Sequence, residues 1–233
     1  MVDYQTAFEK PFTDIKKLLI GILFSIVPII NFFARGFILE CSGIGKNRAK
    51  KMPEWKDFGS LFVKGLLYFI ITMIYFIPAV VVFLIGAGAA IINLANSIPW
   101  QQVMNSSEQE AVTLIEPIIE NAAPSFAAAL PFIIISFILA LIALYILPIA
   151  VLSYIEKGFG KAFALKSVFR KAFTGKYFIA WILMILVNLI LTNLLKIVPI
   201  AGVPAAVFIS GVIAYSLFGQ VYMETESIKP KRK

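Results

Sequence analysis

The side chains of this chain that could carry out acid–base chemistry are carboxylates and lysines, because the sequence has no histidine and a single cysteine, Cys41. A His-ligated metal or haem and a Ser-His or Cys-His nucleophile are therefore excluded. Acid–base catalysis would require two or more of four side chains to meet in one pocket, namely Glu40, Glu54, Asp57 and Lys64. This is the weakest of three functional hypotheses, so we expect a protein that is not an enzyme and has no cofactor or metal.

A transport pathway would need polar side chains inside apolar segments, and the candidates are Asn31, Arg35, Asn188 and Asn193. Asn31 and Arg35 are four residues apart, so both lie on one face of a helix. In membranes, however, amide side chains also join helices by hydrogen bonds, and an arginine near a helix end can snorkel toward water. A transporter or channel component for a small solute is therefore the alternative hypothesis.

Cationic side chains interleaved with apolar ones form the third candidate site. In Lys161–Lys176 the apolar residues fall on one helical side, whereas Lys166, Arg170 and Lys171 fall largely on the other. Segment 53–64 is similar, with Trp55 as an anchor at headgroup depth. Each Lys or Arg near an anionic bilayer contributes on the order of 1 kcal/mol to binding. We expect contacts with anionic lipid headgroups through Trp55, Lys56, Lys64, Lys161, Lys166, Arg170, Lys171 and Lys176.

The elements that would position these residues are long apolar runs. Four stretches contain no Asp, Glu, Lys or Arg: Gly65–Ser107, Asn121–Ile155, Tyr177–Leu195 and Ile197–Met223. Crossing about 30 Å of hydrocarbon takes about 20 residues of helix, and a backbone in lipid must satisfy its hydrogen bonds internally. Hydrophobic residues make up 60% of the chain and charged ones 15%. The sequence therefore predicts an all-α, polytopic helical membrane protein.

The apolar runs predict one helical transmembrane domain over 1–233 with four secure spans, at 65–95, 126–155, 177–195 and 204–223. An earlier apolar run around Pro28 is ambiguous. As a single span it would place Lys16 and Lys17 outside, whereas two short helices that turn near Pro28 keep the N-terminus inside. We favour this hairpin over 18–44, with a single span as the alternative.

The positive charge of the chain, +8 overall, is concentrated in blocks. Basic residues gather in loops 46–64 and 157–176 and in the tail 224–233, whereas the 96–125 connection carries glutamates and no lysine or arginine. By the positive-inside rule, the basic loops and the C-terminus are cytoplasmic and the 96–125 loop is outside. Segments 53–64 and 157–176 are expected to be interfacial helices.

The expected location is the plasma membrane, with several spans. The expected partners are the lipid bilayer and its anionic headgroups, together with another membrane protein or a second copy of the chain. Nucleic acid is not expected, because the basic loops lie close to the bilayer.

The string Pro53-Glu54-Trp55-Lys56-Asp57-Phe58-Gly59 is followed by Leu61-Phe62-Val63-Lys64-Gly65-Leu66. Together with Lys16–Gly21, Ile26–Ile29 and the basic Ala162–Lys176 segment that leads to Ala180-Trp181, this string resembles a mainly archaeal family of multipass membrane proteins classed as domain of unknown function 4013. The resemblance implies a multipass fold and an archaeal source, and it implies no catalytic or ligand residue.

The interfacial basic segments are the conspicuous specialisation of the sequence. We therefore predict a non-catalytic membrane-organising protein that binds lipid or a partner, and we rank it above the transporter and the enzyme.

Overall fold

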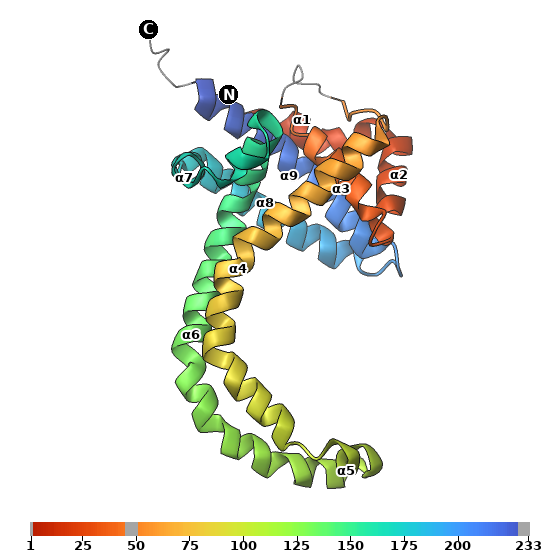
Figure 1. Ribbon diagram of the computed structural model, residues 1–233. Coiled ribbons are helices and arrows are strands. Elements are labelled where there is room, and N and C mark those ends of the chain that lie inside the picture. The colour runs from red at the N-terminus through yellow and green to blue at the C-terminus, as the bar shows by residue number, and fades with distance from the viewer. Residues whose placement is uncertain (1, 45–50, 228–233) are drawn as a thin grey trace. The chain divides into compact units, whose positions relative to one another are not determined.

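The computed structural model describes residues 2–44 and 51–227, and these residues are mostly helical (Figure 1). Four helices are long and apolar enough to cross a membrane: α4 (Phe58–Ser97), α6 (Glu108–Lys157), α8 (Gly175–Leu195) and α9 (Gly202–Ser227). The shorter elements are α1 (Tyr4–Glu9), η1 (Lys10–Thr13), α2 (Ile15–Ile26), α3 (Asn31–Glu40), α5 (Trp100–Asn105), η2 (Phe159–Phe163) and α7 (Leu165–Ala172). No strand occurs in the described residues. The predicted fold class, a polytopic all-α membrane protein, is confirmed.

The chain forms two compact units, and α4 and α6 contribute to both. The larger unit comprises residues 1–72 and 145–233, and the smaller unit comprises residues 73–144. In the smaller unit, α4 and α6 run antiparallel and are connected through α5 (Figure 1). A Cβ added to Gly86 of α4 would lie 2.0 Å from Cβ of Phe132 on α6, so the two helices are in close contact there.

The central helix of the larger unit is α9. It packs against α1, α2, α3 and α8. Of its most apolar stretch, 61% is buried inside the protein, against 11% for α4 and for α8. Phe208, Val212, Leu217 and Val221 of α9 are fully buried. A helix that is apolar on all sides is expected in such an enclosed position, so α9 is surrounded largely by protein.

Residues 15–40 fold as two short helices rather than as one continuous span. α2 ends at Ile26 and α3 begins at Asn31, with Pro28 in the turn between them. The rings of Phe24 and Phe33 meet across this turn, with centroids 6.0 Å apart. The two helices therefore form a hairpin, and its depth in the membrane stays a prediction.

Segment 53–64 does not form a separate helix. Residues 53–57 have no helical structure, and 58–64 are the first two turns of α4. Asp57 has a φ of 52°, which is outside the helical region, and its side chain accepts a hydrogen bond of 3.2 Å from the amide of Ser60. This local cap starts α4 at Phe58, and hydrophobic periodicity alone does not reveal it.

Segment 157–176 is likewise divided, here into η2, α7 and the first residues of α8. Gly158 has a φ of 90°, a conformation that glycine adopts readily, and α6 ends just before it. The hydroxyl of Thr174 accepts a hydrogen bond from the amide of Tyr177 and thereby caps the start of α8. The predicted single interfacial helix is therefore replaced by a short helix, α7, between two breaks.

The predicted outer loop, 96–125, is largely helical. α4 continues to Ser97 and α6 begins at Glu108, with α5 between them. With 40 and 50 residues, α4 and α6 would be about 60 and 75 Å long if straight, which is at least twice the thickness of the hydrocarbon. Both helices therefore contain more residues than one direct crossing requires. The placement of this segment outside the cell stays a prediction.

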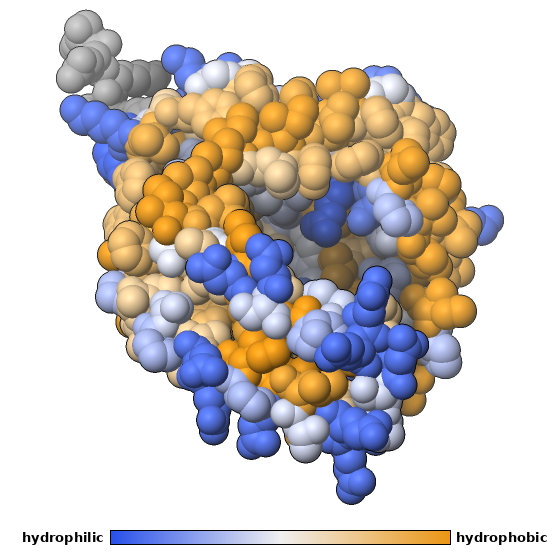
Figure 2. Space-filling view, turned by 60° about the horizontal axis from the view of Figure 1, so that its bottom comes forward, coloured by the Kyte–Doolittle hydropathy of each residue, from blue (hydrophilic) through white to orange (hydrophobic). Residues whose placement is uncertain are grey.

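Hydrophobic residues cover wide areas of the molecular surface (Figure 2). Ile85 of α4, Phe137 of α6 and Ile190 of α8 are 67%, 62% and 62% exposed. A surface of this kind is a liability in water but a suitable contact for lipid tails. Together with the four long apolar helices, it defines a multipass membrane protein.

The crossing of α3 and α4 depends on two glycines. A Cβ added to Gly36 would lie 1.9 Å from the carbonyl oxygen of Leu61, and one added to Gly65 would lie 1.9 Å from that of Phe32. Gly36→Ala should therefore force the helices apart and cost about 1–3 kcal/mol, seen as a lower melting temperature of the purified protein in detergent. Gly88→Ala is the matched control, because no atom lies within 4 Å of an added Cβ there. Equal melting temperatures of the two variants would contradict this account of the crossing.

Candidate functional site

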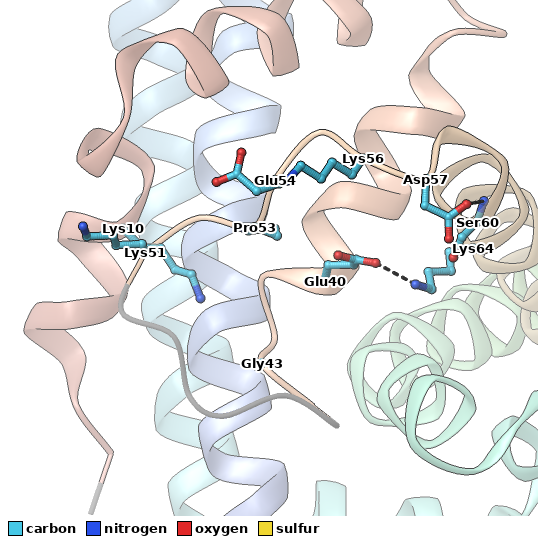
Figure 3. A pocket seen from close by; sticks show the side chains of 10 residues that line it. All are labelled: Lys10, Glu40, Gly43, Lys51, Pro53, Glu54, Lys56, Asp57, Ser60 and Lys64. Atoms are coloured by element: carbon cyan, nitrogen blue, oxygen red, sulfur yellow. Dashed lines mark hydrogen bonds and ion pairs between the residues drawn. The ribbon is translucent and has the colours of Figure 1, made fainter.

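A cavity of about 420 Å³ lies beside the start of α4 in the larger unit (Figure 3). Its walls come from η1, from the end of α3 and from the segment that leads into α4. We call it the basic pocket, and its lining residues are Lys10, Glu40, Gly43, Lys51, Pro53, Glu54, Lys56, Asp57, Ser60 and Lys64. The pocket brings together the four side chains that the enzyme hypothesis requires.

Each carboxylate of the basic pocket already has a partner. The ammonium of Lys64 donates a hydrogen bond of 2.7 Å to Glu40, and that of Lys17 donates one of 2.5 Å to Glu54. Asp57 caps the first turn of α4. Figure 3 shows Glu40 and Lys64 facing each other from α3 and α4. The carboxylates therefore tie the walls of the pocket together, which favours a structural role over proton transfer.

Lys10 is the buried cation of the basic pocket, with 4% of its surface exposed. Its ammonium donates a hydrogen bond of 2.7 Å to the carbonyl oxygen of Cys41. Burial lowers the pKa of the Lys10 ammonium, and the nearby Cys41 opposes this shift only in part. Burial also raises the pKa of the Cys41 thiol to about 12. That thiol is therefore protonated at neutral pH and is a poor nucleophile.

The predicted lipid-binding residues near the basic pocket have different surroundings. Trp55 is half-buried, its ring stacks on Phe37 with centroids 4.0 Å apart, and its indole nitrogen donates a hydrogen bond to the carbonyl of Lys17. These contacts give Trp55 a packing role within the α2–α3 hairpin, which the sequence-based role as a lipid anchor did not include. Lys64 is engaged with Glu40, whereas Lys56 is exposed.

Lys171 was predicted to face lipid headgroups, and the structure corrects this. The residue is 3% exposed, and its ammonium pairs with Glu226 of α9. The same ammonium lies 3.6 Å from the centre of the Tyr222 ring. Lys171 shares the buried side of α7 with Val168 and Ala172, so its charge is used inside the protein.

The outward side of α7 combines apolar and cationic side chains. Leu165, Phe169 and Phe173 are 51%, 37% and 65% exposed, and the Phe169 and Phe173 rings stack on each other. Lys166 and Arg170 are exposed beside them. We call these side chains, together with the exposed Lys161 of η2, the α7 surface. An arrangement of apolar side chains flanked by cations is typical of a segment at a membrane interface.

Two further contacts hold α7 in place. The hydroxyl of Tyr145 on α6 donates a hydrogen bond of 2.8 Å to the carbonyl of Ala172. The Tyr145 ring also contacts those of Phe173 and Trp181. Lys176, at the start of α8, is exposed, and its ammonium nitrogen lies 2.6 Å from a carboxylate oxygen of Glu224. The orientation of α7 is thus determined by contacts to α6 and α9.

The four predicted intramembrane polar residues are not gathered in one place. The amide of Asn188 donates a hydrogen bond of 2.8 Å to the hydroxyl of Ser210 and so links α8 to α9. Asn193 is exposed and bonds to its own helix and to Lys196. Arg35 lies over the ring of Tyr68 on α4, 5.6 Å from its centre. Asn31 lies at the start of α3. Within the described residues, no hydrogen bond or ion pair joins Arg35 to Asn188 or Asn193, which favours separate packing roles over a shared pathway.

Lys10 and Lys51 are the functional candidates that sequence reasoning missed. Lys10 lies ahead of the first apolar run, far in sequence from Glu40 and Lys64. Only the packing of η1 against the end of α3 brings its ammonium to the carbonyl of Cys41. No sequence pattern identifies a contact of this kind, because it depends on where η1 packs.

The fold, with its four long apolar helices, defines a helical multipass membrane protein. The chain belongs to the family described as Protein of unknown function (DUF4013), whose model matches residues 19–202. This confirms the family resemblance inferred from the Trp-bearing motif. No curated protein and no solved structure matches the chain.

Replacing Glu226 should destabilise the protein, because the buried Lys171 charge would lose its carboxylate. The side chains of Lys171 and Glu226 are 4% and 20% exposed, so water compensates little. Glu226→Gln should lower the free energy of unfolding by about 3 kcal/mol. Glu224→Gln is the control, because its partner Lys176 is 58% exposed and the loss should be below about 1 kcal/mol. Thermal unfolding in detergent measures both, and a smaller effect for Glu226→Gln would contradict the buried pair.

The lowered pKa of Lys10 predicts a pH dependence of stability. The folded pKa lies below the unfolded value of 10.5, so the folded protein binds fewer protons than the unfolded one between these values. The contribution of Lys10 to stability should therefore rise as pH increases toward 10.5. The measured quantity is the difference in melting temperature between the wild type and Lys10→Met. This difference, wild type minus variant, should be more positive at about pH 10 than at about pH 7. An equal difference in melting temperature at the two pH values would contradict this account of Lys10.

Proposed function

We propose that this protein is a non-catalytic membrane-organising protein that binds anionic lipid headgroups through the α7 surface. The observation that carries the proposal is the outward side of α7, where Leu165, Phe169 and Phe173 lie beside Lys166 and Arg170. Apolar side chains of this size enter the headgroup region, while the adjacent cations attract acidic lipids.

The rigid attachment of α7 supports this proposal. Lys171 pairs with Glu226 beneath the helix, and Tyr145 bonds to the carbonyl of its last residue, Ala172. A helix attached in this way presents its outward side in one orientation, so little ordering entropy is lost when lipid binds. The buried cation thus has a positioning role, and the exposed cations have the binding role.

The proposal includes a location and an orientation. The protein lies in the plasma membrane, with the α7 surface and the C-terminus on the cytoplasmic side. The support is the concentration of basic residues in 157–176 and their absence from 96–125. The proposal extends to another membrane protein or a second copy of the chain as a partner of the same surface.

A catalytic protein is the second candidate, because the basic pocket gathers Glu40, Glu54, Asp57 and Lys64. Acid–base catalysis needs a group that can exchange a proton with a substrate within hydrogen-bond reach. Glu40 and Glu54 instead accept hydrogen bonds from lysines, and Asp57 caps α4. These contacts favour the binding protein over the enzyme.

Neutralising the α7 surface should weaken the binding of acidic lipid. Lys166→Gln with Arg170→Gln removes two exposed charges and should cost about 2 kcal/mol, roughly 30-fold in affinity for phosphatidylglycerol. Native mass spectrometry of the detergent-solubilised protein measures stepwise lipid binding, with phosphatidylcholine as the neutral reference lipid.

The matched control is Lys16→Gln with Lys196→Gln, which removes two exposed lysines elsewhere on the protein. This pair should leave binding of phosphatidylglycerol within about twofold of the wild type. If both double variants lose affinity equally, net charge rather than the α7 surface accounts for lipid binding, and the proposal fails.

A further inference from the structure

The basic pocket contains three lysines without a carboxylate partner among the described residues: Lys10, Lys51 and Lys56. They come from two parts of the chain, since Lys10 belongs to η1 and the other two to the segment before α4. Of the three acids of the pocket, Glu40 pairs with Lys64 and Glu54 pairs with Lys17. Asp57 caps α4 and is the one acid left opposite the three lysines among the described residues. The pocket therefore has an excess of positive charge that its own carboxylates do not neutralise.

Lys10 is the most informative of the three because it is buried. Burying an ammonium is unfavourable unless hydrogen bonds or an opposite charge replace the lost water. Its one hydrogen bond to the described residues goes to the carbonyl of Cys41, although an ammonium has three N–H donors. Burial lowers the pKa of Lys10, and a bound anion would reverse part of that shift.

The size of the cavity fits a small ligand. About 420 Å³ lies within the range of small-molecule sites, and the lining is mostly polar and includes Ser60 (Figure 3). Several lysine ammonium groups around one cavity are suited to the distributed charge of a phosphate group.

We propose that the basic pocket binds a phosphate group through Lys10, Lys51 and Lys56. The group belongs either to an acidic phospholipid headgroup or to a soluble phosphate. This site goes beyond the proposed function, because it shares no residue with the α7 surface. Lys10 contributes a buried charge. Lys51 and Lys56, which are exposed and lie in the segment before α4, contribute the other two charges.

The test uses the purified full-length protein in detergent and two probes. Inorganic phosphate, compared with chloride at equal ionic strength, tests the soluble source by its effect on the melting temperature. Phosphatidic acid, compared with phosphatidylcholine in native mass spectrometry, tests the lipid source. The pocket variant is Lys51→Gln with Lys56→Gln, because both side chains are exposed and their loss leaves the fold intact.

At least one probe should bind the wild type, and the pocket variant should bind it about 25-fold more weakly, at about fivefold for each lysine. Lys16→Gln with Lys196→Gln should bind that probe like the wild type. Lys166→Gln with Arg170→Gln should leave the stabilisation by inorganic phosphate unchanged, because the α7 surface is proposed to bind lipid headgroups. Pocket-dependent stabilisation by inorganic phosphate identifies the soluble source, and dependence seen with phosphatidic acid alone identifies the headgroup.

The proposal is overturned if neither probe binds, or if the pocket variant binds as tightly as the wild type. It is also overturned if Lys16→Gln with Lys196→Gln loses as much affinity as the pocket variant. A loss confined to the Lys166→Gln, Arg170→Gln variant would overturn the pocket and leave the α7 surface standing. A loss confined to the pocket variant with both probes would support the pocket, irrespective of the result for phosphatidylglycerol.

Discussion

The enclosure of α9 is the constraint on which the larger unit depends. α1, α2, α3 and α8 all pack against it, and side chains such as Phe208 and Leu217 are fully buried. The approach is close as well, since a Cβ on Gly219 would lie 2.1 Å from the carbonyl oxygen of Ser42. A tightly packed central helix leaves its neighbours few alternative positions. The end of α3 lies against α9 near Gly219, and the end of α7 is held at the C-terminal end of α9 by the Lys171–Glu226 pair.

Ionic pairing then decides which lysines are held by a carboxylate. Glu226 and Glu224 of α9 pair with Lys171 and Lys176, and Glu40 of α3 pairs with Lys64. These pairs tie loops and helix ends to the packed unit. The buried Lys171–Glu226 pair is costly to break, whereas the Lys176–Glu224 pair contributes little because Lys176 is exposed. Among the described residues, several of the cations without a carboxylate partner gather in two cationic surfaces. One combines exposed cations and apolar side chains on α7, and the other lines a cavity around the buried Lys10.

Much of the fold was predictable because lipid restricts the backbone strongly. Apolar runs of bilayer length must be helical, and Pro28 marks the turn of the α2–α3 hairpin. Helix ends were less predictable: Asp57 and Thr174 act as local caps, and Gly158 ends α6. The exposure of single lysines was not predictable from periodicity. Lys171 was assigned to the cationic side of a long helix, yet the actual short helix turns it toward Glu226.

The sequence by itself determined the class of the protein, the four long apolar helices, the family and the distribution of charge, because each of these follows from residue types along a continuous stretch. Tertiary structure alone decided that Trp55 packs on Phe37 and that Lys171 is buried. It also decided that Lys10 reaches the pocket formed with Glu40 and Lys64. The physical reason is that burial and ion pairing depend on which helices meet, and contacts between distant segments leave no periodic signal in the chain.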